Sequence, residues 1–180
     1  MGRPTVAYID LDHYLQNLIN IKKHVGQNVK VCAMVKADAY GHGLIPISKV
    51  AQKSKMVDYL GVATIEEGVT LRQNGITLPI LCVGAVFAES LEDAVAKDIM
   101  QTIYSTEHLA MLQKACKKLN KQARVHLKLE TGMNRLGISS GNELQQLLDE
   151  LPNYPDIILD GVFTHFATSD CEDKSFTNEQ

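Results

Sequence analysis

Residues 29–43 read VKVCAMVKADAYGHG, and the rest of the chain is organised around this stretch. Its first half is a valine-rich apolar run, which is typical of a buried strand. The run ends on Lys36, and glycines at positions 41 and 43 then interrupt the pattern. Burial disfavours an ammonium ion, so a lysine at such a strand end can deprotonate and attack a carbonyl to form a Schiff base. The alternative is a lysine that merely extends its charge into solvent.

Strands and helices alternate along the whole chain. Apolar runs predict strands at residues 6–9, 29–36, 60–63, 79–83, 99–103, 124–130 and 157–164. Helical spacing and capping residues predict a helix after each of these strands except the last. The caps are Asp10 or Asp12, Thr64 with Glu67, Ser90 with Asp93, Ser105 or Thr106, and Ser140 with Glu143. This alternation predicts an α/β fold whose parallel sheet is covered by helices.

Two architectures fit the alternation, a doubly wound sheet and a (β/α)8 TIM-type barrel. Six strands follow the first helix, and six are too few to close an eight-stranded barrel. The polar tail at residues 169–180 finishes no element. We therefore expect residues 1–180 to be one part of a single α/β domain.

The bulk composition narrows the function classes. A net charge of −3 over 180 residues gives no reason to expect nucleic acid or an anionic membrane as a partner. No apolar run is long enough to span a bilayer, and the first residues lack the apolar core of a signal peptide, so we expect a cytoplasmic protein. The four cysteines are scattered, which predicts neither a metal site nor a disulfide framework. Cys32 and Cys82 lie in apolar runs and are expected to be buried thiols.

The strand at 124–130 alternates apolar and polar residues. Its apolar residues should meet the covering helices, so Arg124, His126, Lys128 and Glu130 should point to the interior of a barrel. In a free-standing sheet the same polar face would meet water. Buried charges are costly unless they bind one another or a polar ligand.

Two further polar residues follow strand ends. Arg135 lies in the loop after residues 124–130, and His165 closes the run at 157–164. Alone, each has an ordinary explanation, a solvated arginine and a structural histidine. Together with Lys36 they all fall at the carboxyl ends of parallel strands, where α/β folds place their sites. We therefore expect these three residues to share one site.

Several blocks of the sequence resemble one family, the alanine racemases. Residues 35–43 (VKADAYGHG) are similar to that family's pyridoxal-phosphate lysine motif. Residues 127–137 (LKLETGMNRLG), 161–167 (GVFTHFA) and 7–12 (AYIDLD) match other blocks in the family's order and spacing. The resemblance implies an eight-stranded α/β barrel followed by a β-rich C-terminal domain, in a homodimer. It also implies the cofactor pyridoxal 5'-phosphate.

The resemblance assigns roles by position. Lys36 would form the aldimine with the cofactor and act as a catalytic base. Tyr40 would contact the cofactor. Arg135 would bind both the cofactor and the carboxylate of the substrate, and His165 would lie against the cofactor ring. Lys128 resembles a lysine that some members carry as a carbamate.

The implied function is the interconversion of L- and D-alanine, which supplies D-alanine for peptidoglycan. The second catalytic base, a tyrosine from the partner's C-terminal domain in the family, has no counterpart in residues 1–180, so the resemblance does not by itself predict turnover by this stretch alone. Two alternatives remain, a non-catalytic pyridoxal-phosphate-binding protein with the same barrel and a racemase for serine or a broader set of amino acids. The sequence blocks match the racemase pattern better than that of the non-catalytic proteins.

Overall fold

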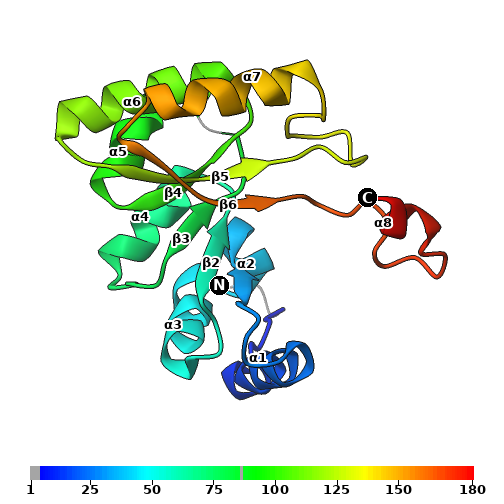
Figure 1. The fold of residues 1–180 in the computed structure, drawn as a ribbon. Helices are drawn as coiled ribbons and strands as arrows, with labels where there is room; N and C mark the ends of the chain where they lie inside the picture. The colour runs from blue at the N-terminus through cyan, green and yellow to red at the C-terminus, as the bar shows by residue number, and fades with distance from the viewer. Residues whose placement is uncertain (1–4, 86) are drawn as a thin grey trace.

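The computed structural model describes residues 5–85 and 87–180 (Figure 1). Its strands are β1 Cys32–Met34, β2 Tyr59–Val62, β3 Ile80–Cys82, β4 Ile99–Ile103, β5 Ala123–Lys128 and β6 Ile157–Phe163. The α-helices are α1 Leu11–Val25, α3 Leu44–Ser54, α4 Ile65–Gln73, α5 Leu91–Ala96, α6 Thr106–Leu119, α7 Asn142–Glu150 and α8 Ser175–Glu179. The segment labelled α2, Lys36–Gly41, is a turn with left-handed backbone angles. Two short 3-10 helices, Ala88–Ser90 and Leu151–Asn153, complete the described elements. None of the described helices is long and apolar enough to cross a membrane.

The six strands form one parallel sheet in the order β1-β2-β3-β4-β5-β6. A doubly wound sheet reverses its strand order at a switch point, whereas a (β/α)8 barrel adds each strand beside the previous one. The sequential order therefore selects the barrel. Within the described residues β1 and β6 are not paired with each other, so the barrel is open between these two strands.

The hydrophobic core lies between the sheet and its covering helices. Leu60, Ile80 and Val125 of the strands are each 0% exposed, and Leu109 and Leu147 of α6 and α7 pack in the same cluster. Val125 and Leu127 face the helices as predicted, because both are buried in this core. Of the polar residues on this strand, His126 and Lys128 line the interior cavity as predicted. The prediction is wrong for Glu130, whose carboxylate binds backbone amides of the loop that follows the strand.

Two of the five capping predictions are confirmed by side-chain hydrogen bonds, whereas Ser90 and Ser105 stand at the N-cap positions of α5 and α6 without making a capping bond. Asp10 caps α1 by accepting hydrogen bonds from the amides of Asp12 and His13 at 3.0 and 2.9 Å. Thr64 and Glu67 form the predicted capping box of α4. The cap predicted at Ser140 is wrong, because α7 begins after Gly141, and no side chain caps it.

Three other expectations need correction. Residues 6–9 form no strand, and Val6 and Tyr8 are 65% and 93% exposed, because no neighbouring strand pairs with this segment among the described residues. The first barrel strand is only Cys32–Met34, since the backbone turns after Val35. Cys32 is exposed, because it faces the open interior of the barrel and not the helix layer, whereas Cys82 is buried as expected.

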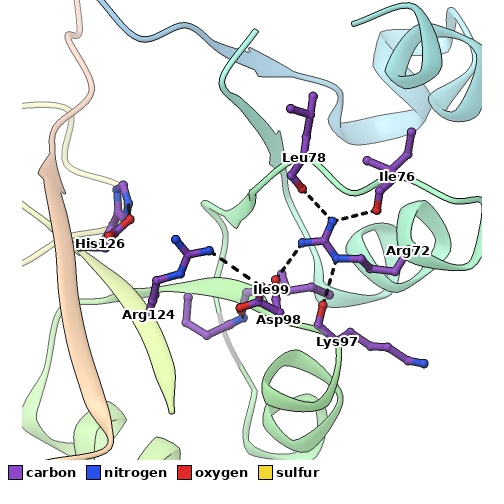
Figure 2. Close-up of polar contacts among 10 residues, drawn as sticks. Arg72, Ile76, Leu78, Lys97, Asp98, Ile99, Arg124 and His126 are labelled. Atoms are coloured by element: carbon purple, nitrogen blue, oxygen red, sulfur yellow. Dashed lines mark hydrogen bonds and ion pairs between the residues drawn. The ribbon is translucent and has the colours of Figure 1, made fainter. Parts of the chain in front are cut away.

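At the amino ends of the strands, opposite Lys36, one arginine side chain binds the turns that precede two strands (Figure 2). The Arg72 guanidinium, at the end of α4, donates hydrogen bonds to four backbone carbonyls, those of Ile76, Leu78, Lys97 and Asp98. These carbonyls lie in the turns that lead into β3 and β4. A single side chain therefore fixes where two adjacent strands begin.

Candidate active site

A cavity of about 420 Å³ opens at the carboxyl ends of β1, β5 and β6. All five residues singled out in the sequence line this one cavity: Lys36, Tyr40, Lys128, Arg135 and His165. Apolar side chains form much of the remaining wall, among them Met34, Leu81, Val83 and Phe163. The strand ends thus bring together residues that are as far apart in sequence as positions 36 and 165.

The backbone after Lys36 is an unusual left-handed turn. Ala37, Asp38, Ala39 and Tyr40 have φ between 51° and 57° and ψ between 35° and 53°. Left-handed backbone costs an L-residue about 1–2 kcal/mol, so four in succession cost roughly 4–8 kcal/mol. The sequence predicted only a glycine-bearing loop here. Strain of this kind persists where surrounding contacts hold it, and it gathers at functional sites.

Local hydrogen bonds hold the far end of this turn. The Asp38 carboxylate accepts the Leu44 amide at 2.7 Å, and the Asp38 carbonyl accepts the Gly43 amide at 2.9 Å. Ala39 is 5% exposed and donates its amide to the Val35 carbonyl at 2.8 Å. Gly43 has φ of 93°, which explains why glycine stands there. The turn therefore ends firmly against the start of α3.

Lys128 is a buried cation on the interior face of β5. The residue is 4% exposed, and its Nζ lies 4.9 Å from the centre of the Phe163 ring. Desolvation lowers the pKa of Lys128, the positive charge of Arg135 lowers it further, and Glu130 opposes both. No ion pair to Lys128 occurs among the described residues. The interior charge predicted from the alternation of β5 is therefore present.

Arg135 is carried by a loop that Glu130 folds. The Glu130 carboxylate accepts the backbone amides of Gly132 at 2.6 Å and Arg135 at 3.1 Å. These and neighbouring backbone amides, led by that of Asn134, lower the pKa of Glu130 to about 2. Because Glu130 binds backbone and not the guanidinium, the Arg135 side chain stays free to face the cavity.

The pKa of His165 is lowered by its position in the cavity. Desolvation is the largest cause of its lowered pKa, followed by the positive charges of Arg135, Lys128 and Lys36. No aspartate or glutamate lines the cavity among the described residues. Three cations without a carboxylate partner make a site for an anionic ligand.

The cavity fits pyridoxal phosphate in its chemistry. A lysine amine stands beside apolar walls that suit a planar ring, and free cations suit its oxyanions. Within the described part of the chain, no group of three histidine, cysteine or acidic residues could hold a metal ion.

Sequence reasoning missed some of the cavity walls. Cys32 and Met34 precede Lys36 by four and two residues in the predicted strand, so strand periodicity could have placed them on the same interior face. Leu81 and Val83 carried no comparable signal, because the run at residues 79–83 is apolar throughout and shows no alternation.

The fold and the site define a parallel α/β-barrel domain with a lysine-bearing, cationic cavity at the carboxyl edge of its strands. The family described as alanine racemase, N-terminal domain, matches residues 9–180, and the chain belongs to this family.

Individual proteins similar to this chain are alanine racemases, in agreement with the family match. Alanine racemase 1 of Caldanaerobacter subterraneus subsp. tengcongensis is 40% identical over 99% of this chain and 46% of its own length. Alanine racemase 1 of Bacillus subtilis is 41% identical over 97% of this chain and 44% of its own length. A solved Clostridium difficile alanine racemase, in complex with cycloserine, is 44% identical with a TM-score of 0.94, covering 99% of this chain and 49% of that one. The chain thus spans about half the length of the relatives it matches.

Proposed function

We propose that the protein carrying this chain is an alanine racemase that interconverts L- and D-alanine with pyridoxal 5'-phosphate. The observation that carries the proposal is the shared cavity of Lys36, Arg135, His165 and Lys128, which is lined by no aspartate or glutamate of the described residues. The family's enzymes depend on this cofactor, and bound pyridoxal phosphate supplies an electron sink for the charge left at Cα when the α-proton is removed.

The chain's own residues supply placement and proton transfer. Lys36 would hold the cofactor through its amine, and the same amine would remove or return the α-proton on one face of the substrate. Arg135 binds the substrate carboxylate and a cofactor oxygen. Tyr40 and His165 would contact the cofactor, and both border the cavity beside Lys36.

Lys128 is proposed to become a carbamate. Its lowered pKa favours the neutral amine, which can add to carbon dioxide and lose one proton to form a carbamate anion. The modification replaces a buried cation next to Arg135 with an anion that can orient the guanidinium. It therefore removes the repulsion that the unmodified side chains share.

The remaining parts of the proposal concern the whole protein. Residues 1–180 would form the N-terminal part of the barrel domain, followed by a seventh and an eighth strand and a β-rich domain. The open edge between β1 and β6 supports this, because unpaired parallel strand edges need a neighbour. A partner subunit in a homodimer would supply a tyrosine as the second base. The enzyme would act in the cytoplasm, making D-alanine for peptidoglycan.

The test uses the full-length protein incubated with pyridoxal phosphate and then reduced with borohydride. In the wild type, mass spectrometry should find the reduced cofactor on the peptide that contains Lys36. In Lys36→Ala the corresponding peptide should carry no label. Lys49→Ala replaces an exposed lysine on α3 and serves as the matched control, which should keep the label on Lys36. Chiral analysis should show L-alanine becoming D-alanine in the wild type. Racemisation that persists in Lys36→Ala would refute the role of Lys36. Cofactor labelling without racemisation would favour a non-catalytic binding protein, and faster turnover of serine would favour a broader racemase.

A further inference from the structure

The backbone that carries Lys36 is tied to a neighbouring strand by one carboxylate. We propose that Glu67 is a positioning residue for Lys36: it binds the left-handed turn after β1 to the end of β2 and so fixes where the Lys36 amine lies. This inference deepens the proposed function and rests on it, because it concerns the lysine that holds the cofactor.

Glu67 makes more bonds than its helix requires. In a capping box the glutamate needs only to accept the amide of the capping residue, here Thr64 at 3.3 Å. Its two shortest bonds go elsewhere. Oε1 accepts the amide of Ala37 at 2.7 Å, and Oε2 accepts the amide of Ala63 at 2.8 Å. One carboxylate therefore links the first turn of α4 with the ends of both β1 and β2.

The bond to Ala37 replaces a missing rung of the sheet. The amide of Val35 donates to the carbonyl of Gly61 at 2.8 Å, as expected for parallel strands. Two residues later the Ala37 amide would continue this ladder, but Ala37 has φ of 52° and has left the strand. Glu67 reaches over and accepts this amide instead. The ladder thus ends on a side chain.

Lys36 is consequently held from both sides. The residue before it is bonded to Gly61, and the residue after it is bonded to Glu67. In the described part of the chain, the Glu67 bond is the one side-chain hydrogen bond that reaches residues 36–41 from a distant segment. The bonds of Asp38 hold the turn only to its own neighbours, so they cannot set its place against β2.

Strain makes this anchor important. A left-handed turn of non-glycine residues relaxes if its contacts are lost, and relaxation at Ala37 moves the Cα of Lys36. A shift of a reacting group by about 1 Å is enough to cost a large part of its reactivity. Glu67 therefore acts on the site through the backbone, without lining the cavity.

The test compares Glu67→Gln with Glu66→Gln in the full-length protein. Glutamine has the same shape but keeps one acceptor and places an amide group where the second acceptor was. Glu66 lies in the same first turn of α4, and its side chain makes no hydrogen bond or ion pair in the described residues. Glu67→Asp keeps the charge but shortens the reach, and it should behave like Glu67→Gln.

Two measurements are made well below the unfolding temperature of each variant. Amide hydrogen exchange at Ala37 should be at least about tenfold faster in Glu67→Gln, the factor for losing one charge-assisted hydrogen bond. The dissociation constant for pyridoxal phosphate, followed through borohydride-trapped label on Lys36, should rise by a similar factor. Glu66→Gln should match the wild type in both. A purely structural role would lower the unfolding temperature and leave the label on Lys36 unchanged.

The outcomes separate this inference from the proposed function. Wild-type exchange at Ala37 together with wild-type cofactor binding in Glu67→Gln would overturn the role of Glu67. If Glu66→Gln shows the same faster exchange at Ala37 and the same weaker cofactor binding as Glu67→Gln, the role of Glu67 is overturned as well. If the wild type carries no label on Lys36, the proposed function fails, and fast exchange at Ala37 in Glu67→Gln would still show that Glu67 holds the turn.

Discussion

Replacing Arg72 with methionine should strongly destabilise the fold while leaving the site intact. Methionine keeps much of the apolar stem and removes only the guanidinium. Four hydrogen bonds are lost, at 2.9 and 2.7 Å to the carbonyls of Ile76 and Leu78 and at 3.0 and 2.9 Å to those of Lys97 and Asp98 (Figure 2).

The magnitude follows from the burial of these bonds. The bonds to Ile76 and Leu78 are partly buried, and a hydrogen bond to a charged group contributes about 1.5–3 kcal/mol. The bonds to Lys97 and Asp98 are exposed, so water replaces them at little cost. Taking the lower value for each partly buried bond gives a loss of about 3 kcal/mol in the free energy of unfolding.

Arg124→Met is the matched control, because this arginine belongs to the same cluster. Its Nη2 lies 3.9 Å from Oδ2 of Asp98, and both side chains are substantially exposed. Exposed ion pairs contribute about 0–1 kcal/mol, so this variant should lose less than about 1 kcal/mol. Urea unfolding of both variants measures the difference. The reasoning is refuted if Arg72→Met stays within about 0.5 kcal/mol of the wild type, the scatter of ordinary surface substitutions, or if the two variants lose the same amount.

Two further predictions concern the loops of the site. The pKa of Glu130 is about 2 in the fold and 4.5 without it, so its stabilising effect is complete above pH 4.5 and is lost as the pH falls towards 2. Between pH 4.5 and about pH 2, the free energy of unfolding should therefore fall less steeply in Glu130→Gln than in the wild type. The same pH dependence in both proteins would contradict this. In Gly84→Ala the new Cβ would lie 2.0 Å from the carbonyl oxygen of Ala63, a backbone atom that cannot rotate away. Gly84 does not have a positive φ, so the cost of the substitution is steric and not conformational. Thermal unfolding should show that the variant loses about 1–3 kcal/mol or more in the free energy of unfolding. A variant as stable as the wild type would show that the strands can separate there.

Most of the fold could be predicted, because its signals are local. Six strands and their covering helices follow from apolar runs and caps such as Asp10 and the pair Thr64 and Glu67. The false strand at residues 6–9 has the same apolar pattern as a true strand, but a strand also needs a partner, and the sequence does not show one. The missed start of α7 has a similar cause, since Ser140 resembles a cap while Gly141 takes that place.

The choice between barrel and doubly wound sheet depended on strand order, which sequence periodicity does not contain. The same holds for the contacts that make the site precise. The sequence marks Glu67 as a capping residue, but its bond to Ala37 joins segments thirty residues apart. Only the packing of β1 against β2 brings them within reach.

The sequence by itself determined the strand that leads to Lys36, the polar residues of β5 and the family resemblance, because each of these depends on a short run of neighbouring residues. The tertiary structure decided that Lys36, Lys128, Arg135 and His165 share one cavity. It also decided that the backbone after Lys36 is left-handed. The physical reason is that convergence of strand ends and a strained backbone both depend on long-range contacts, which form only when distant segments pack together.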